Sequence, residues 1–279
     1  MTISRVDLTA RLVRAIGAVT PRPQVLVSSS AVGLYGSQAD TVLTEASPAG
    51  ADFLASLCAA WESAAFAARR FGVRVATVRT GVVLGREGGA LAQMLPPFKM
   101  GVGGPIGNGR QYFPWIHLHD LVRVYVTALS DSRYDGPING VAPGEATSTT
   151  FARALGRTLH RPAVLPVPAL ALRLLFGEAA CVLLDSQRAR PERLLALGFP
   201  FQFPDLPGAL RDVLATPDVH IGPNGPSAHA ASGRGQAGPN PGLSPSDTAY
   251  LEARPACYAL RATTVIDAPI EDEIGRAHV

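Results

Sequence analysis

The chain has 279 residues, of which 47% are hydrophobic and 17% are charged, and its formal net charge is +3. This composition is sufficient for one sizeable core, and because the arginines are scattered without a basic run, it gives little support to nucleic-acid binding. The cysteines are dispersed, and residues 1–7 show no signal-peptide pattern. The longest apolar run, 163–176, is broken by two prolines. We therefore expect a soluble cytoplasmic protein without disulfides or membrane contacts.

The first third of the chain alternates between helix and strand patterns. Ser4–Ala18 places its apolar residues on one broad helical face, and Val25–Val27 is a short, fully apolar strand. Ala51–Phe71 is rich in alanine without glycine or proline, which predicts a long helix, and 73–79 is a second β-rich run. Apolar strands that alternate with helices are typical of a doubly wound parallel sheet with right-handed crossovers.

The middle of the chain is predicted to be less regular. Gly85–Gln111 is rich in glycine and proline, so we expect a long loop with a short helix around Leu91–Met94. Gln111–His117 is predicted to be extended, and Pro137–Val141 to be a further strand. Between them, Asp120–Leu129 has helical periodicity. Its apolar residues at i, i+3, i+4 and i+7 are Val122, Tyr125, Val126 and Leu129.

From Ser148 onward the pattern changes to short helices, predicted over 151–159, 168–176 and 191–197. We therefore expect three parts: residues 1–147 as an α/β domain, 148–214 as a small, mostly helical lobe, and 215–279 as a tail. The tail is dominated by proline, glycine, serine and alanine, so it buries too little apolar surface to fold. Its last seven residues resemble a translated sequencing adapter, which suggests that part of it is artefactual.

The stretch VLVSSSAVGLYG (residues 25–36) is the strongest functional signal. Ligands of open α/β sheets lie just past the carboxyl ends of the strands, which is where Ser28, Ser29 and Ser30 are expected. A turn serine that bonds its own backbone is an equally good interpretation of Ser30. Tyr35 offers a phenol near the same place, although a tyrosine that packs in the turn is favoured.

Several motifs together resemble one family. They are VLVSSSAVGLYG, FLASLCAAWESAA, RTGVVLGREGGALAQMLPPFKMGVGGPIGNGRQYFPWIHLHDL, PINGVAP and LLDSQRARPERLLALGFPFQFP. The chain is similar, over roughly 4–214, to the atypical extended short-chain dehydrogenases/reductases labelled "epimerase family protein". These are NAD-dependent epimerase/dehydratase-like proteins with a C-terminal domain of unknown function. The resemblance implies a Rossmann-type fold, NADP or NAD as cofactor and a small-molecule substrate.

The resemblance also implies a strand, glycine loop and helix for the cofactor pyrophosphate, ahead of Ser4, that this sequence lacks. A G-x-x-G-x-x-G match at Gly101, Gly104 and Gly107 lacks the strand–loop–helix context that such a site needs. We therefore expect an N-terminally truncated, inactive fragment with a partial Rossmann-type sheet that holds no cofactor tightly. The strand 25–27 would then be an exposed apolar edge that promotes aggregation.

Members of the wider dehydrogenase group use a serine with tyrosine and lysine spaced Y-x-x-x-K, in which the tyrosine transfers the proton. The only lysine here is Lys99, and Leu95 stands four residues before it, so this chain has no such pair. Alignment of the long helix places Leu54 and Cys58 at the two positions. The departure puts standard hydride-transfer catalysis in doubt. The remaining catalytic candidates are Ser30, which matches the serine of the family beside the substrate carbonyl or hydroxyl, and Tyr35.

The resemblance further suggests which residues hold ligands. The turn after the second strand is expected to lie against the nicotinamide, with Gly81 permitting close backbone approach. An H-x-H pair, His117 and His119, lacks a third ligand at metal spacing, so we expect no metal and interpret His119 with Asp120 as a helix cap. The expected cofactor-binding residues are Ser28, Ser29, Arg79, Thr80, Gly81, Val82 and Val83, and the expected substrate residues are Arg110, Gln111 and Trp115.

The function that the resemblance implies for the intact protein is NAD(P)-linked oxidoreductase or epimerase chemistry on an unidentified small molecule. The alternative is a non-catalytic, cofactor-sensing or scaffold protein that keeps the fold without turnover. The missing tyrosine and lysine favour the alternative, whereas the serine turn and the substrate loop favour the enzyme. The sequence indicates neither the substrate nor the oligomeric state, and it does not discriminate NAD from NADP.

Overall fold

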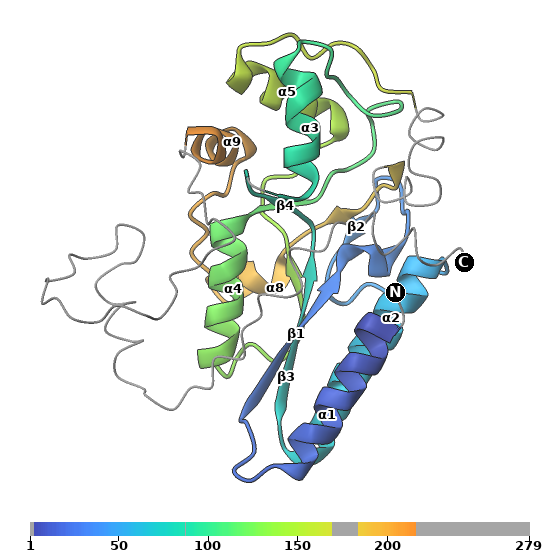
Figure 1. Cartoon of the computed structure of the whole chain (residues 1–279), viewed down its shortest axis with the longest axis vertical. Coiled ribbons are helices and arrows are strands. Elements are labelled where there is room, and N and C mark those ends of the chain that lie inside the picture. Colours follow the sequence, from blue (N-terminus) through green and yellow to red (C-terminus); the bar gives the residue numbers. More distant parts are fainter. Residues whose placement is uncertain (1–2, 87, 169–183, 216–279) are drawn as a thin grey trace, which may run out of the picture. The chain divides into compact units, whose positions relative to one another are not determined.

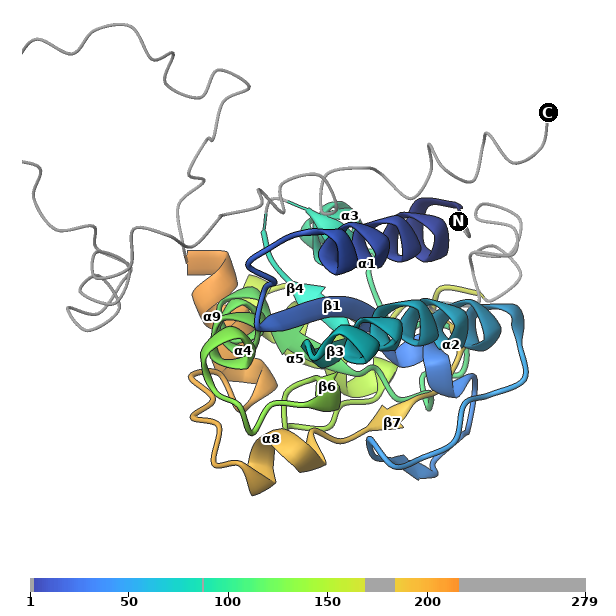
Figure 2. The same cartoon turned by 90° about the horizontal axis from the view of Figure 1, so that it is seen from below.

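The central sheet of the computed structural model has three parallel strands in the order β1 (Val25–Ala31), β3 (Arg74–Thr80) and β6 (Gly136–Gly140). Figure 1 labels β1 and β3, and Figure 2 labels β6 as well. Its register places Ser30 of β1 opposite Arg79 of β3. Parallel neighbours need long crossover connections, and helices lie in the chain between each pair of these strands. The expected Rossmann-type α/β fold is thereby confirmed.

The structure describes residues 3–86, 88–168 and 184–215. The expected helix over 168–176 and the expected tail over 215–279 therefore lie outside the described part of the chain, except for residues 168 and 215. Residues Met1–Asp218 form one compact unit.

Helices cover both faces of the sheet (Figure 2). On one face, α1 (Leu8–Ala18) and α2 (Phe53–Phe66) pack with Leu26 of β1. On the other face, α4 (Leu118–Ser130) packs with the next residue, Val27. Neighbouring residues of a strand point to opposite faces, so the apolar run of β1 serves two core clusters at once. A single π-helical turn, Ile3–Asp7, precedes α1.

Strand β1 is longer than the sequence predicts, because its ladder with β3 continues through the three serines to Ala31. The serines therefore lie within the strand, and the turn after it is a short 3₁₀ helix, Val32–Tyr35. Within the described residues, β1 pairs only with β3, and its first three side chains are half-buried. The described part of the sheet thus ends at β1.

Helix α2 begins at Phe53, two residues after the predicted start, because Asp52 caps it, with Oδ1 accepting from Ala55 N at 2.8 Å. It continues as a 3₁₀ helix, Ala67–Phe71, and ends at Gly72, whose φ of +77° favours glycine. Helix α3 (Gly89–Lys99) is longer than expected despite the two prolines inside it. Its buried side chains are spaced i, i+4 and i+7, so packing on the core holds the helix together: Leu91, Leu95 and Phe98.

Helix α4 forms as predicted, but it buries a different face. Leu121, Val124 and Ala128 are buried, whereas Val122 and Val126 of the predicted apolar stripe are about half exposed (52% and 50%). The helix is capped by His117 and not by His119 with Asp120 as expected, because His117 Nδ1 accepts from His119 N at 3.1 Å. Asp120 instead accepts from the backbone N–H groups of residues 202 and 203.

Two small parallel sheets lie beside the main one. One pairs β4 (Val82–Leu84) with β5 (Trp115–His117), and the other pairs β2 (Val42–Leu43) with β7 (Arg188–Ala189). No helix in the described part of the chain is long and apolar enough to cross a membrane.

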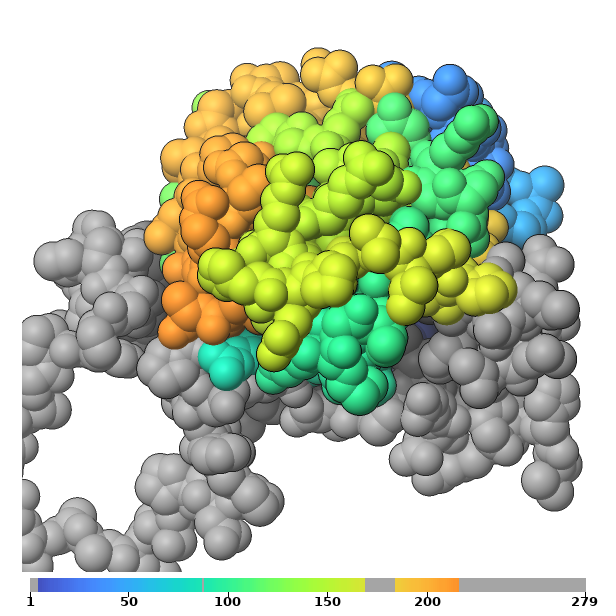
Figure 3. All heavy atoms as spheres, turned by 90° about the horizontal axis from the view of Figure 1, so that it is seen from above, coloured from blue at the N-terminus to red at the C-terminus, as the bar shows by residue number. Residues whose placement is uncertain are grey.

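The C-terminal helices share a core with the residues before them. Helices α5 (Ser148–Leu159) and α9 (Leu206–Ala215) lie side by side in Figure 3, and α8 (Glu192–Ala196) packs near β6. One core cluster joins Trp115 and Phe98 with side chains of α5 and α9. Residues on both sides of the expected boundary at 147 therefore belong to the same packed core.

Candidate functional site

The serines at the carboxyl end of β1 point alternately to the two faces of the sheet. Ser30 is 4% exposed and faces α2, and Ser28 lies on the same side. Ser29 is half-buried and faces α4. The carboxyl ends of β1 and β3 are adjacent, with Ala31 opposite Thr80, so the structure brings these predicted ligand residues to one edge.

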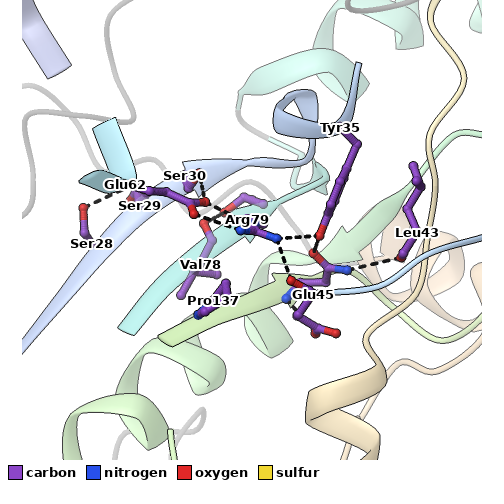
Figure 4. Close-up of polar contacts among 12 residues, drawn as sticks. Ser28, Ser29, Ser30, Tyr35, Leu43, Glu45, Glu62, Val78, Arg79 and Pro137 are labelled. Atoms are coloured by element: carbon purple, nitrogen blue, oxygen red, sulfur yellow. Dashed lines mark hydrogen bonds and ion pairs between the residues drawn. The ribbon is translucent and has the colours of Figure 1, made fainter. Parts of the chain in front are cut away.

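On the α2 face, a buried ion pair lies against Ser30 (Figure 4). Ser30 Oγ donates to Glu62 Oε1 at 2.7 Å. Arg79 binds both oxygens of the same carboxylate, from Nε to Oε1 at 2.8 Å and from Nη2 to Oε2 at 2.9 Å. All three side chains are buried, and such two-point, charge-assisted contacts are among the strongest hydrogen bonds in proteins.

The network continues from Arg79 to Tyr35 and on to β6. Arg79 Nη1 donates to the Tyr35 hydroxyl at 2.9 Å and to the Glu45 carbonyl at 3.2 Å. The Tyr35 hydroxyl lies 2.6 Å from Asn139 Oδ1, and Asn139 N donates to Glu45 Oε1 at 2.9 Å. Tyr35 is 0% exposed, so its phenol is enclosed by the protein and links the ion pair to the sheet.

Burial and charge act in opposite directions on the groups of this network. Burial alone would lower the pKa of Arg79, but hydrogen bonding to Glu62 raises it above its usual range. Burial raises the pKa of Tyr35, and the neighbouring Arg79 partly offsets this. Both groups therefore keep their ordinary neutral-pH forms, guanidinium and neutral phenol.

On the α4 face, three hydroxyl groups gather at the same edge. Ser29 Oγ lies 2.7 Å from the hydroxyl of Tyr125. The Thr80 side chain lies beside this phenol and donates from Oγ1 to the Val78 carbonyl at 3.3 Å. Burial raises the pKa of Tyr125, so this phenol is neutral. All three residues are only half-buried. This group presents uncharged donors and acceptors next to the edge strand.

Gly81 lies tightly against a neighbouring segment of the chain, and its expected approach to the nicotinamide stays a prediction. A Cβ at this position would lie 2.7 Å from the Pro114 carbonyl oxygen and 2.9 Å from Val141 Cγ1. The close backbone approach that requires glycine is thus to the segment before β5, where Val82 N donates to Pro114 O at 2.7 Å. Val82 and Val83 are half-buried members of β4.

The three expected substrate residues are in unlike environments. Trp115 is 1% exposed and donates from its indole to the Gly144 carbonyl at 2.7 Å, so it is a core residue in this structure. Gln111 is buried and donates to the Ile106 carbonyl at 3.0 Å. Of the three, Arg110 alone is exposed.

The resemblance places Leu54 and Cys58 at the helix positions of the usual tyrosine and lysine, and both residues are apolar in character. Leu54 is half-buried, and Cys58 is buried, with a pKa raised by that burial, which makes it a poor nucleophile. Among the described residues, no group of three or more His, Cys, Asp or Glu side chains could hold a metal ion.

Glu62, Asn139 and Tyr125 are not among the site residues that the sequence predicts. The available signal was a charged residue in an apolar element: Glu62 in an alanine-rich helix and Arg79 in an apolar strand. Glu62 and Arg79 also line an open hollow of ≈ 390 Å³ on this face. Its other lining residues are Leu34, Ser47, Ala49, Ala59, Ser63 and Phe66.

Comparison with known proteins gives consistent matches. A sequence model of the NAD dependent epimerase/dehydratase family matches residues 2–139, and one of a domain of unknown function (DUF1731) matches residues 167–213. "Epimerase family protein SDR39U1" of Mus musculus is 45% identical over 214 residues, which cover 76% of this chain and 73% of that protein.

A plant relative and a solved structure extend this similarity. The chloroplastic SDR39U1 homolog of Arabidopsis thaliana is 46% identical over 213 residues, or 76% of this chain, which spans 61% of that relative's length. The crystal structure of human epimerase family protein SDR39U1 (isoform 2) with NADPH matches with a TM-score of 0.73 and 39% identity. That match covers 77% of this chain and 73% of the human chain.

Proposed function

Because this chain belongs to the NAD dependent epimerase/dehydratase family, we propose that it carries a site for NADP(H)-linked oxidoreductase or epimerase chemistry on a small molecule. The observation that carries the proposal is the meeting of hydroxyl side chains at one edge of the sheet, where β1 and β3 end side by side. Ligands of open α/β sheets bind outside this edge. The family resemblance expected from the motifs is confirmed by the relatives.

The donor set at this edge fits the uncharged end of a nicotinamide cofactor. Ser29, Thr80 and Tyr125 offer neutral hydroxyls to the amide and ribose groups of such a cofactor. The human relative was solved with NADPH, which supports NADP(H) over NAD. When bound, the cofactor supplies a hydride donor or acceptor. These protein residues would orient the nicotinamide end of the cofactor and would not contact its phosphates.

A second candidate function is cofactor binding without turnover. Two observations favour it: Leu54 and Cys58 occupy the helix positions of the usual tyrosine and lysine, and the nearby Tyr35 phenol is enclosed in the protein. Without a described phenol–ammonium pair, proton transfer to a substrate needs another group. A sensor or scaffold would keep the fold and the cofactor while lacking that step.

The test is thermal melting of the chain with and without excess NADPH. A ligand that binds only the folded state raises the midpoint, by the equivalent of about 2.7 kcal/mol at one hundred times the Kd. We expect a rise that Ser29→Ala reduces and that Ser56→Ala, on the exposed surface of α2, leaves unchanged. A melt indifferent to NADPH would contradict the proposal and support the sequence-based expectation that this chain holds no cofactor tightly.

Turnover separates the two candidate functions. Oxidation of bound NADPH in the presence of a panel of aldehydes and ketones supports the oxidoreductase. Tight NADPH binding with no oxidation by any member of the panel, and no reduction of NADP⁺ by the matching alcohols, supports the cofactor-binding protein. Absorbance at the reduced nicotinamide band follows both reactions.

A further inference from the structure

The hydroxyl of Ser30 has one proton, and this proton is used in a hydrogen bond to Glu62. Oγ lies 2.7 Å from Glu62 Oε1, and both residues are buried. A carboxylate only accepts hydrogen bonds, so Ser30 must be the donor in this contact. The direction of this hydrogen bond therefore follows from the chemistry of its acceptor.

Arg79 keeps Glu62 in the accepting form. The guanidinium donates from Nε to Oε1 and from Nη2 to Oε2, so both carboxylate oxygens face N–H donors. A protonated carboxyl would place an O–H against one of these N–H groups. The same guanidinium also donates to the Tyr35 hydroxyl and the Glu45 carbonyl, and these contacts hold it in this orientation.

What Ser30 has left to offer a ligand is its lone pairs. Among the described residues, no side chain or backbone group donates a hydrogen bond to Ser30 Oγ. A hydroxyl oxygen has acceptor lone pairs besides its one donor, so this acceptor at the carboxyl end of β1 suits a ligand that carries a donor.

We infer that Glu62 is a positioning residue, which turns Ser30 Oγ into a hydrogen-bond acceptor and so selects a ligand with an alcohol O–H over one with a carbonyl oxygen. The inference rests on the proposed function, since it concerns the same edge of the sheet, and it narrows the substrate class to hydroxyl-bearing molecules. It also separates this site from the tyrosine–lysine arrangement, in which a phenol donates to a carbonyl.

The experiment compares cyclohexanol with cyclohexanone, which share a ring and differ in the group presented to Ser30. Binding of each probe to the full chain is followed by NMR titration of the Ser30 and Ala31 amides, alone and with NADP⁺. We expect the alcohol to bind about five- to tenfold more tightly, the worth of one hydrogen bond. A separate melt with NADP⁺ alone reports on the proposed function, so its failure is not confused with failure of this inference.

Variants of Ser30 and Glu62 test which residues cause the preference for the alcohol over the ketone. Ser30→Ala should bring the ratio of the two dissociation constants close to one by weakening the alcohol alone, and Ser30→Thr should restore it. Glu62→Gln, whose amide can donate to Oγ, should lower the ratio without equal loss of cyclohexanone binding. Ser56→Ala, on the exposed surface of α2, should leave it unchanged.

The inference is overturned if the ketone binds wild type as tightly as the alcohol, if neither probe shifts the two amides, or if Ser30→Ala keeps the preference. Should Glu62→Gln fail to fold, the Ser30→Ala and Ser30→Thr pair still decides the acceptor role. The ratio of the two affinities is the readout, because a purely structural role would weaken both probes alike.

Discussion

The Tyr35 hydroxyl and Asn139 Oδ1 lie 2.6 Å apart, although the two residues are 104 positions apart in the chain. Asn139 donates from its amide nitrogen to the Arg190 carbonyl at 2.8 Å, so its oxygen is the acceptor for Tyr35. The same hydroxyl accepts from Arg79. One phenol therefore joins the turn after β1, the end of β3 and the strand β6.

Tyr35→Phe removes this junction and leaves Arg79 and Asn139 each short of one partner. We expect a loss of about 1–3 kcal/mol in the free energy of unfolding, measured by urea denaturation, because buried groups lose their hydrogen bonds. Tyr112→Phe is the control, since that ring stacks on Arg188 and has no part in the network. If Tyr35→Phe and wild type have the same free energy of unfolding, the hydrogen bonds of Tyr35 do not contribute to stability.

Arg79→Met leaves the Glu62 carboxylate buried without its cation. Breaking a buried pair from one side typically costs about 3–5 kcal/mol, whereas an exposed pair contributes at most about 1 kcal/mol. Arg69→Met is the matched control, because the Arg69–Asp135 pair is about half exposed at 48% and 47%. Adding Glu62→Met to Arg79→Met should recover part of the loss; additive losses would contradict direct coupling of the two residues.

Acid should destabilise the chain through His117. Its Nδ1 accepts from His119 N at 3.1 Å, its Nε2 lies 3.2 Å from Asp212 Oδ2, and burial lowers its pKa below 6.5, with Asp212 and Asp120 opposing the shift. A folded-state pKa below the unfolded value means that stability is present above the unfolded value. It is lost as the pH falls from about 6.5 through the folded value.

The measurement is the free energy of unfolding between pH 7.5 and pH 5, for which one histidine contributes a slope of at most about 1.4 kcal/mol per pH unit. His117→Asn, which can still cap the helix, should flatten the profile. His160→Asn, at an exposed residue with φ of +55° that asparagine tolerates, should keep the wild-type profile. A profile that His117→Asn leaves unchanged would rule His117 out as its source.

Gly81→Ala tests whether this glycine serves packing or the cofactor. The new methyl group would clash with the Pro114 carbonyl, so we expect a loss of about 1–3 kcal/mol in the free energy of unfolding. Gly88→Ala is the control, because a Cβ there meets nothing within 4 Å, and it should stay within about 0.5 kcal/mol of wild type. Unchanged stability with a lost NADPH response would favour the cofactor role instead.

The alternation of helices and strands was predictable from the sequence because it depends on local patterns. The apolar run of β1, the alanine-rich α2 and the glycine at its end each specify their element from neighbouring residues. The same is true of the ligand edge: parallel strands present their carboxyl ends together, so serines after an apolar strand could be placed there. The family motifs then supplied the cofactor class.

Helix α4 shows where local pattern was insufficient. Its periodicity predicted a helix, yet the stripe with Val122 and Val126 is exposed and the face with Val124 is buried. The direction in which a helix faces depends on the sheet that it covers and on where its chain ends are anchored. Here His117 and Asp120 anchor the start of the helix, through contacts that the spacing of apolar residues does not encode.

The sequence by itself determined the elements, their parallel arrangement and the edge at which hydroxyl groups gather. Only the tertiary structure decided what those hydroxyls do, because their partners lie far away along the chain. Ser30 meets Glu62 across 32 residues, Ser29 meets Tyr125 across 96, and Tyr35 meets Asn139 across 104. A hydrogen bond acts over about 3 Å of space regardless of separation in sequence, so its partner is known only once the chain has folded.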